Sequence, residues 1–318
     1  MHLARAGHTV VLWGRDPRLV SELASRRANA VYLPDVMLPD GVQVTADLAA
    51  ALAGAPLVVS VVPSHGTRDV IRRAVPHLAP GAIVVSATKG LEAETHYRMS
   101  EVLVQELGQE TGGVRYAVLS GPSFAAELAR GLPTAVSVAS PDPEVVQTVL
   151  ADFRTSYFRL YGTSDVIGVE LGGAMKNVIA IAAGVVEGLG LGHNAQAGLI
   201  TRGLAEISRL ACAAGAQRET LSGLTGLGDL VLTCTGSLSR NRHVGIELAH
   251  GRALPEILAG MKMVAEGVRT TDAALALGAA YDVELPITAQ VAELLAGRKA
   301  ARTALYDLME RPQRAEVG

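Results

Sequence analysis

Short runs of β-branched residues alternate with segments of helical period from residue 9 to about residue 161. This alternation is typical of βαβ units, in which helices cover both faces of a parallel sheet. The first three runs are nearly continuous apolar stretches, as expected for strands buried on both faces. We expect strands at residues 9–13, 57–62, 82–87, 116–120, 135–139 and 157–161, and helices at residues 17–28, 46–53, 67–78, 95–107 and 144–153.

The pattern changes after Gly162, where stretches rich in Ala, Leu and Ile with helical spacing continue to the end of the chain. We expect helices at residues 165–189, 195–214, 240–250, 267–280, 286–295 and 299–309. We therefore predict a doubly wound, Rossmann-like α/β domain over residues 1–162, followed by an all-helical domain over residues 163–318. A chain of 318 residues that is 49% hydrophobic has enough apolar material for a core in each domain.

The composition argues against several partners. With 28 Lys and Arg against 31 Asp and Glu, the chain has no basic surplus to neutralise nucleic acid or an anionic membrane, and its 3% aromatic residues offer few rings for base stacking. Cys212 and Cys234 form no cluster with metal-ligand spacing, so we expect no metal. No apolar stretch of signal-peptide or membrane-spanning length is present, so we expect a cytoplasmic protein without membrane insertion.

The chain lacks the usual signature of a dinucleotide-binding unit. Such a unit begins with a strand and a GxGxxG turn that opens a helix, and about 20 residues later the end of the second strand meets the ribose. No GxGxxG occurs here. If residues 9–13 are the second strand, residues 2–6 end the first helix, Gly7 caps it, and the glycine turn would lie upstream of Met1. We expect a form without the first strand; the alternative is a fold that never had it.

Arg15 then occupies the position that meets the cofactor ribose. An acidic residue there would bond the ribose hydroxyls and repel a 2′-phosphate, whereas a guanidinium offers that phosphate a planar fork. Most arginines on such loops are solvated surface charges, but the position favours a functional role. We predict that NADPH is accepted.

Two short motifs follow predicted strands. In SATKG (residues 86–90), Lys89 lies at the carboxyl edge of the sheet, where open α/β sheets bind their ligands, so a contact with phosphate or cofactor is as well supported as a surface charge. In SGPSF (residues 120–124), Gly121 would let the backbone approach a ligand closely. A tight strand-to-helix turn alone also explains that motif.

Lys176 lies in ELGGAMKNVIA (residues 170–180), and its neighbours three and four positions away are glycine or apolar. A lysine on such a surface snorkels to the rim or points into a cleft, where desolvation lowers its pKa and makes it a proton donor. Asp165, Lys176 and Glu187 are spaced by 11 residues, so a polar stripe facing water is the alternative. We favour the cleft, because the glycines let a ligand or another backbone come near.

The stretch GLGDLVLTCTGSLSRNR (residues 226–242) combines one carboxylate with several hydroxyls. Asp229 stands in uncharged surroundings and needs a cationic partner, for which Lys176 is a candidate. Ser239 is suited to cap a helix. Arg240 or Arg242 beside that helix N-terminus would make an anion site.

Three further polar residues invite weaker interpretations. Glu266, in MKMVAEG (residues 261–267), is expected to begin a helix. His193 and His243 have no partner carboxylate at a suggestive spacing, so we expect structural or surface roles for both.

Several of these motifs together are family-specific. VLWGRDP (residues 11–17), ATKGLE (87–92), SGPSFA (120–125), GGAMKNVIA (172–180) and the 226–242 stretch closely resemble those of the bacterial NAD(P)-dependent glycerol-3-phosphate dehydrogenases, in order and over essentially the whole chain. The departure is the absent first strand and glycine turn. The resemblance implies an oxidoreductase that reduces dihydroxyacetone phosphate to sn-glycerol 3-phosphate for phospholipid synthesis, with NADP or NAD as the cofactor.

The resemblance also implies roles for individual residues. Lys176 would protonate the C2 oxygen as hydride arrives, and Asp229 would orient it. The implied substrate contacts are Lys89, Gly121, Ser123, Lys176, Asp229, Ser239, Arg240 and Asn241. The implied cofactor contacts are Lys89, Ala125, Arg240, Val264 and Glu266, in addition to Arg15.

Two other functions stay open on the sequence. A related dehydrogenase acting on a small hydroxy acid would prefer a carboxylate to a phosphate. A truncated, inactive chain would bind phosphorylated metabolites or a partner without turnover. A homodimer is compatible with the sequence.

Overall fold

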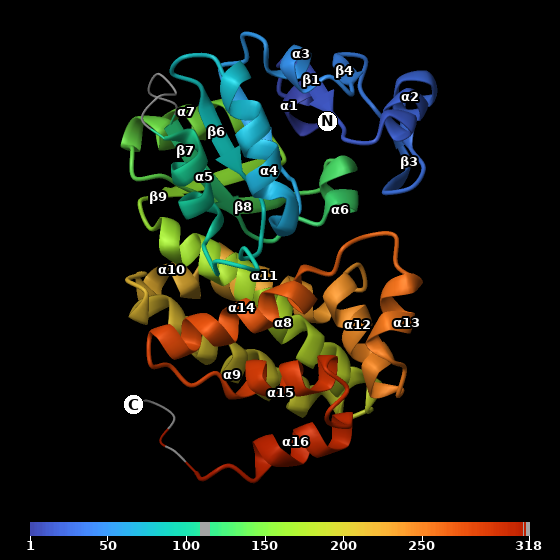
Figure 1. The fold of residues 1–318 in the computed structure, drawn as a ribbon, viewed down its shortest axis with the longest axis vertical. Coiled ribbons are helices and arrows are strands. Elements are labelled where there is room, and N and C mark those ends of the chain that lie inside the picture. Colours follow the sequence, from blue (N-terminus) through green and yellow to red (C-terminus); the bar gives the residue numbers. More distant parts are fainter. Residues whose placement is uncertain (109–114, 314, 316–318) are drawn as a thin grey trace.

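The computed structural model describes residues 1–108, 115–313 and 315. Figure 1 shows an α/β part, coloured blue to green, packed against an all-helical part, coloured yellow to red. The last strand, β9 (Phe158–Thr163), ends one residue after Gly162, and helix α8 (Val166–Gly188) follows it into the helical part.

Five strands form the main sheet, and their order follows the sequence. These strands are β5 (Leu57–Ser60), β6 (Ile83–Ser86), β7 (Arg115–Ser120), β8 (Thr134–Ala139) and β9. β5, β6 and β7 are mutually parallel, as are β8 and β9, but β7 and β8 are antiparallel. The predicted Rossmann-like class is confirmed, with this one exception. Residues 121–133 contain only the short helix α6 (Ala125–Ala129), and the chain turns back there instead of crossing the sheet.

The remaining predicted strand, β1 (Val10–Trp13), is the first along the chain. It forms a separate two-stranded sheet with β4 (Val42–Thr45). β1 and β5 thus belong to different sheets. This is expected for a form without the first strand, which would lie between them and pair with both. The prediction missed β4 and the antiparallel pair β2 (Ala28–Asn29) and β3 (Leu33–Met37). Pro34 lies within β3, and proline argues against a strand in a sequence pattern. The short helix α1 (His2–Arg5) occurs as predicted.

Helices cover both faces of the main sheet. Val84 of β6 packs with Ile71 of α4 and Leu103 of α5, whereas Val85, one residue on, faces the opposite side and Val149 of α7. These helices span Ser64–Ala74 (α4), Met99–Leu107 (α5) and Pro143–Phe153 (α7). The remaining elements of this domain are α2 (Pro17–Arg26), α3 (Leu48–Leu52) and the 3₁₀ turn η1 (Val75–His77).

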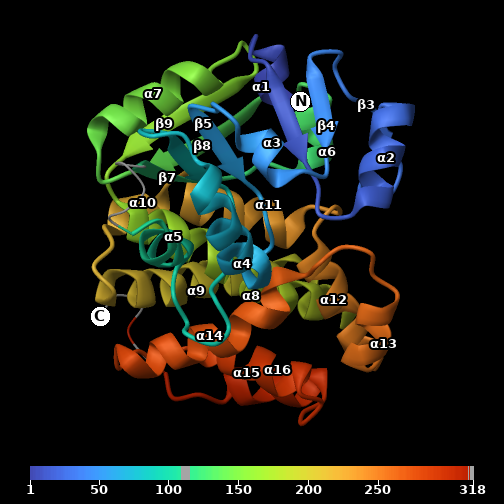
Figure 2. The same ribbon diagram turned by 45° about the horizontal axis from the view of Figure 1, so that its top comes forward.

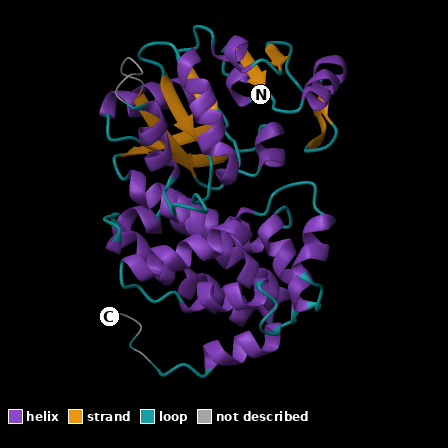
Figure 3. Ribbon diagram, in the orientation of Figure 1, coloured by secondary structure: helices purple, strands orange, loops and turns teal. Residues whose placement is uncertain are grey.

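Helix α8 forms the centre of the helical domain, and most of the other helices pack against it (Figures 2 and 3). It is long and apolar enough to cross a membrane, but 78% of its apolar window is buried inside the protein, as in a core helix. The other elements are α9 (Gly192–Ala213), α10 (Arg218–Ser222), the π-helical turn η2 (Leu224–Gly228), α11 (Asp229–Thr235), α12 (Arg240–Ala249), α13 (Leu254–Ala259), α14 (Glu266–Ala280), α15 (Pro286–Leu295) and α16 (Ala301–Met309). The six long helices were predicted; α10, α11 and α13 were not.

Candidate active site

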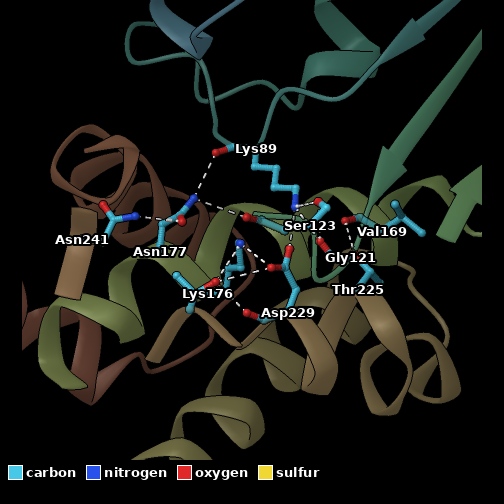
Figure 4. Close-up of polar contacts among 11 residues, drawn as sticks. Lys89, Gly121, Ser123, Val169, Lys176, Asn177, Thr225, Asp229 and Asn241 are labelled. Carbon is cyan, nitrogen blue, oxygen red and sulfur yellow. Dashed lines mark hydrogen bonds and ion pairs between the residues drawn. The ribbon is translucent and has the colours of Figure 1, made fainter. Parts of the chain in front are cut away.

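Three charged side chains converge where the two domains meet (Figure 4). Lys176 comes from α8, Asp229 begins α11, and Lys89 lies on the loop after β6. Lys176 Nζ lies 2.5 Å from Asp229 Oδ1, and Lys89 Nζ lies 2.8 Å from Asp229 Oδ2. Each carboxylate oxygen therefore takes one ammonium group. The predicted pairing of Asp229 with Lys176 is confirmed, and Lys89 adds a second cation.

Both partners in the Lys176–Asp229 pair are shielded from water. Lys176 is 6% exposed and Asp229 1% exposed. Lys176 Nζ also donates to Thr233 Oγ1 at 2.9 Å, and Thr233 donates to the Asp229 carbonyl at 2.6 Å. Thr233 was not predicted as a site residue, although its position one helical turn after Asp229 places both on one face. The ammonium is thus held from two sides by α11.

The polar-stripe alternative for Lys176 is wrong, because Lys176 and Asp165 are each only 6% exposed and do not face water. Asp165 caps the start of α8 by accepting from Gly168 N at 2.8 Å. Glu187 binds the guanidinium of Arg242. Lys176 itself points toward Asp229 and away from bulk water.

Burial and charge set the protonation of the cluster. Burial lowers the pKa of Lys176 to about 8, and the like charge of Lys89 acts in the same direction. Burial alone would raise the pKa of Asp229, but the two ammonium groups hold it below its usual range. Burial raises the pKa of the neighbouring Cys234 thiol to about 12, so the thiol stays neutral. Two ammonium groups on one carboxylate leave one net positive charge and a lysine that can exchange a proton near neutral pH.

Gly121 and Ser123 lie beside the Lys89 ammonium and border the same site. Lys89 Nζ donates to the Gly121 carbonyl at 2.8 Å and lies 3.4 Å from Ser123 Oγ. Gly121 has a φ of 140°, and a Cβ there would lie 2.9 Å from the Cα of Val136. Only glycine fits this turn. The motif therefore forms a tight turn and also lies beside Lys89, so both features expected from the sequence are present.

The paired glycines of α8 serve close approach, as predicted. A Cβ on Gly172 would lie 3.1 Å from the carbonyl oxygen of Thr225, and one on Gly173 would lie 2.5 Å from Ser120 Oγ. The Gly173 position also faces the Lys89 side chain, at 3.6 Å from its Cγ. A methyl group at Gly173 would therefore overlap Ser120 Oγ, and a larger side chain would also meet Lys89.

A chain of amide hydrogen bonds joins both domains beside Lys176. Asn177 Nδ2 donates to the Lys89 carbonyl at 3.1 Å, and Asn241 Nδ2 donates to Asn177 Oδ1 at 2.9 Å. Gly267 N donates to Asn241 Oδ1 at 2.9 Å. The side-chain oxygen of Asn241 is therefore occupied, which leaves an N–H for a ligand. Asn177 lies in the GGAMKNVIA motif but was not predicted as a site residue.

The start of α12 carries a free cation. Ser239 accepts from Arg242 N at 3.2 Å, which confirms it as the helix cap. Arg242 binds Glu187 with Nε at 2.6 Å and Nη2 at 2.5 Å. Arg240 is exposed and makes no ion pair or hydrogen bond with any residue that the structure describes. Of the two arginines considered, Arg240 is the one available to an anion.

Glu266 begins α14, as predicted, and reaches into the other domain. Its Oε1 accepts from Ser64 N at 3.0 Å and its Oε2 from Ser64 Oγ at 2.6 Å. Both oxygens are thus engaged at the start of α4. The sequence gives little signal for this contact, because Ser64 and Glu266 lie 202 residues apart.

The other predicted positions lie outside this cluster. Within residues 1–108, 115–313 and 315, no hydrogen bond or ion pair joins Arg15, Ala125 or Val264 to Lys89, Lys176 or Asp229. His193 and His243 are exposed. In the same described residues, no group of three or more His, Cys, Asp or Glu could hold a metal ion.

Features at the carboxyl edge of the strands fit parts of a nicotinamide dinucleotide. The exposed Arg15 follows β1 and has no ion pair in the described chain, which suits a ribose phosphate. Val61 follows β5 at the same edge of the sheet and is 71% exposed. The glycine turn that would cradle the pyrophosphate does not occur in the sequence.

Comparison with known proteins identifies the family. Residues 1–146 match the family described as NAD-dependent glycerol-3-phosphate dehydrogenase N-terminus, and residues 165–306 match the corresponding C-terminus. The chain is 51% identical to a glycerol-3-phosphate dehydrogenase [NAD(P)+] of Koribacter versatilis over 98% of its own length and 93% of that protein. A similarly named Myxococcus xanthus protein is 51% identical, with 97% and 92% covered.

A solved structure gives the same answer. The glycerol-3-phosphate dehydrogenase of Coxiella burnetii superposes with a TM-score of 0.93 at 41% identity, covering 98% of this chain and 94% of that one. Together these matches confirm the resemblance seen in the motifs. The chain therefore belongs to the NAD-dependent glycerol-3-phosphate dehydrogenase family of oxidoreductases.

Proposed function

We propose that this protein reduces dihydroxyacetone phosphate to sn-glycerol 3-phosphate, reversibly, with NADPH or NADH. One observation carries the proposal: the buried Lys176 shares the Asp229 carboxylate with Lys89, which combines a proton donor near neutral pH with one net positive charge. The names of the relatives support the same reaction.

The residues of the cluster divide the proton chemistry among them. The bound cofactor supplies the hydride that adds to C2. Lys176 Nζ donates the proton that completes the C2 hydroxyl, and in the reverse direction the neutral amine takes it back. Asp229 and Thr233 hold the amine in position in both states. The Lys89 ammonium stabilises negative charge as it develops on the C2 oxygen.

Substrate recognition falls to the start of α12. A phosphate requires fixed positive charge, and the free guanidinium of Arg240 supplies it beside a helix N-terminus. Ser239 and the free N–H of Asn241 lie on the same turn. Gly121 and Ser123 bound the site from the α/β domain.

The cofactor is assigned to residues 1–162 and the substrate mainly to residues 163–318. Arg15 would meet the 2′-phosphate of NADPH, and Ala125 and Val264 would border the dinucleotide, with Lys89 and Arg240 reaching it from the substrate side. Glu266, which is held against Ser64, would also contact the cofactor. We place the protein in the cytoplasm, supplying glycerol 3-phosphate to phospholipid synthesis; two unpaired cysteines fit a reducing compartment.

A substrate panel tests the proposal. The purified chain is assayed with NADPH and NADH against dihydroxyacetone phosphate, dihydroxyacetone and small 2-keto acids, and cofactor binding is followed by the fluorescence of Trp13. We expect turnover with the phosphorylated triose alone. Preference for a keto acid would replace the proposal with the hydroxy-acid dehydrogenase, and cofactor binding without turnover of any substrate would replace it with a metabolite-binding chain.

A further inference from the structure

The loop that carries Lys89 is fastened at its far end as well as at the site. Residues 88–92 connect β6 to the segment before α5, and Lys89 and Glu92 lie three residues apart on it. Leu91, between them, is 1% exposed and belongs to the core of the helical domain. A displacement of Glu92 is therefore transmitted along a short, packed stretch of backbone to Lys89.

Glu92 is held by a two-pronged ion pair. Arg68 Nε lies 2.7 Å from Glu92 Oε1, and Arg68 Nη2 lies 2.7 Å from Glu92 Oε2. Thr95 Oγ1 donates to the same carboxylate at 2.5 Å. The Glu92 side chain is 8% exposed and that of Arg68 22% exposed. Bidentate pairs of this kind fix orientation as well as distance.

Arg68 lies on the turn of α4 that follows Ser64, so both side chains lie on the face that meets the Lys89 loop. A Cβ on Gly90 would lie 2.9 Å from Ser64 Cβ, which shows how tightly the loop is seated on this face. Because Glu266 holds Ser64 from the helical domain, α4 is itself anchored. Arg68 thus binds the Lys89 loop from a helix that is itself held in place.

Arg72, one turn further along α4, provides a natural comparison. Arg68 and Arg72 both bind Glu106 of α5, with Arg68 Nη1 at 2.7 Å and Arg72 Nη2 at 2.9 Å. Only Arg68 reaches Glu92. The two arginines share the helix, the charge and one carboxylate. Arg68 alone binds Glu92 on the Lys89 loop, and it also donates to Gln105 and is less exposed than Arg72, at 22% against 60%.

We propose that Arg68 is a positioning residue that acts through Glu92 to hold the Lys89 ammonium on Asp229, and so beside Lys176. The inference rests on the proposed function for its kinetic consequence but not for its geometry. Without Arg68 the loop loses its ion pair at Glu92. The Asn177 contact still holds the Lys89 backbone, but the Lys89 ammonium is then displaced from Asp229 more easily.

A misplaced Lys89 has a measurable signature on Lys176. The like charge of Lys89 contributes to the low pKa of Lys176, so withdrawing it raises that pKa toward its usual value. The other groups facing Lys176 do not replace it: Asp229 favours the charged amine, and the Cys234 thiol stays neutral. A loss of fold stability alone would not move this pKa.

The experiment compares Arg68→Gln with Arg72→Gln. The pKa of Lys176 is measured by NMR on protein with ¹³Cε-labelled lysine, with Lys176→Met to assign the signal, and kcat and KM are measured across pH. For Arg68→Gln we expect the Lys176 pKa to rise by about half a unit or more and kcat to fall about tenfold. Arg72→Gln should leave both unchanged. Glu92→Gln should reproduce the Arg68→Gln shift, and the double variant should add nothing to it.

The outcomes separate the proposals. An unmoved Lys176 pKa in folded Arg68→Gln, or an equal shift in Arg72→Gln, would overturn the positioning role. Should Arg68→Gln not fold, Arg68→Lys keeps the charge without the fork and takes its place, with the same expected direction. If the wild-type chain turns over no phosphorylated triose, the proposed function fails, while the NMR comparison still decides the role of Arg68.

Discussion

Gly184 of α8 and Gly245 of α12 let the backbones of these two helices touch. A Cβ on Gly184 would lie 1.9 Å from the carbonyl oxygen of Arg242, and a Cβ on Gly245 would lie 1.9 Å from that of Ile181. No side chain could yield to such an overlap, because the obstacle is backbone. This contact fixes the start of α12, with Arg240 and Asn241, beside the part of α8 that carries Lys176.

Replacing Gly184 by Ala should therefore be severely destabilising. The two helices must separate to admit the methyl group, and we expect the free energy of unfolding to fall by about 3 kcal/mol or more. Gly198→Ala is the matched control, because it also lies within a helix, α9, and a Cβ there meets nothing within 4 Å. Urea unfolding should show the control unchanged or more stable by up to about 1 kcal/mol. Equal stability of the two variants would contradict the backbone contact.

Arg240→Gln and Arg242→Gln should differ in kind. Arg240 makes no hydrogen bond or ion pair with the described residues, and Glu266 acts on it only through its charge. Its loss should therefore raise the KM for dihydroxyacetone phosphate roughly 10- to 100-fold with little change in Tm. Arg242 is bound to Glu187, so its loss should lower Tm slightly and leave KM near the wild-type value. Steady-state kinetics and thermal unfolding of both variants check this. An unchanged KM for Arg240→Gln would remove its phosphate role.

The two directions of the reaction should show opposite pH dependence. Reduction needs the charged Lys176, and oxidation needs the neutral amine. Because the pKa of Lys176 in the protein without ligands is about 8, kcat/KM for reduction should fall as the pH rises through about 8, whereas kcat/KM for oxidation should rise over the same range. Lys176→Ala should lose activity in both directions by about a thousandfold or more. Near-normal turnover of that variant would end the proton-transfer assignment.

Glu206→Gln should destabilise the helical domain. Glu206 is 1% exposed and accepts from Ile287 N at 2.8 Å, Thr288 N at 2.9 Å and Thr288 Oγ1 at 2.6 Å, which caps the start of α15. An amide nitrogen would face one of these donors, at a cost of about 2–3 kcal/mol. Urea unfolding measures the loss. The exposed Glu94→Gln should show no change, and a similar loss there would point to net charge as the cause.

Arg15→Glu should reduce the preference for NADPH over NADH. The carboxylate would repel a 2′-phosphate and favour free ribose hydroxyls. The ratio of kcat/KM for the two cofactors measures the effect, and Arg18→Glu, also exposed on α2 nearby, serves as the charge-matched control. A ratio unchanged by Arg15→Glu would leave this arginine as a surface charge.

The sequence predicted those parts of the fold and site whose signal is local. Strands such as β6 are apolar throughout, and Lys176 and Asp229 stand out because each is charged in apolar surroundings. β4 was missed because four residues of mild alternation carry little signal, and the antiparallel pairing of β7 with β8 depends on the path of the chain between them.

Contacts between distant segments could not be predicted in the same way. Ser64 and Glu266 meet only because two domains fold against each other, and the Arg68–Glu92 pair joins a helix to a loop from a different βα unit. Thr233 was within reach, since it follows Asp229 by one turn of a helix, but that helix was itself not predicted.

Asp229 binds one lysine from each domain. The proton affinity of Lys176 therefore depends on how the two lobes are positioned relative to each other. A small rotation of one lobe against the other would withdraw Lys89 while Lys176 stayed in place on its own helix. In a poorly solvated interior, Coulomb energies change steeply with such a movement. When the lobes are misaligned, Lys176 would therefore hold its proton too tightly to donate it.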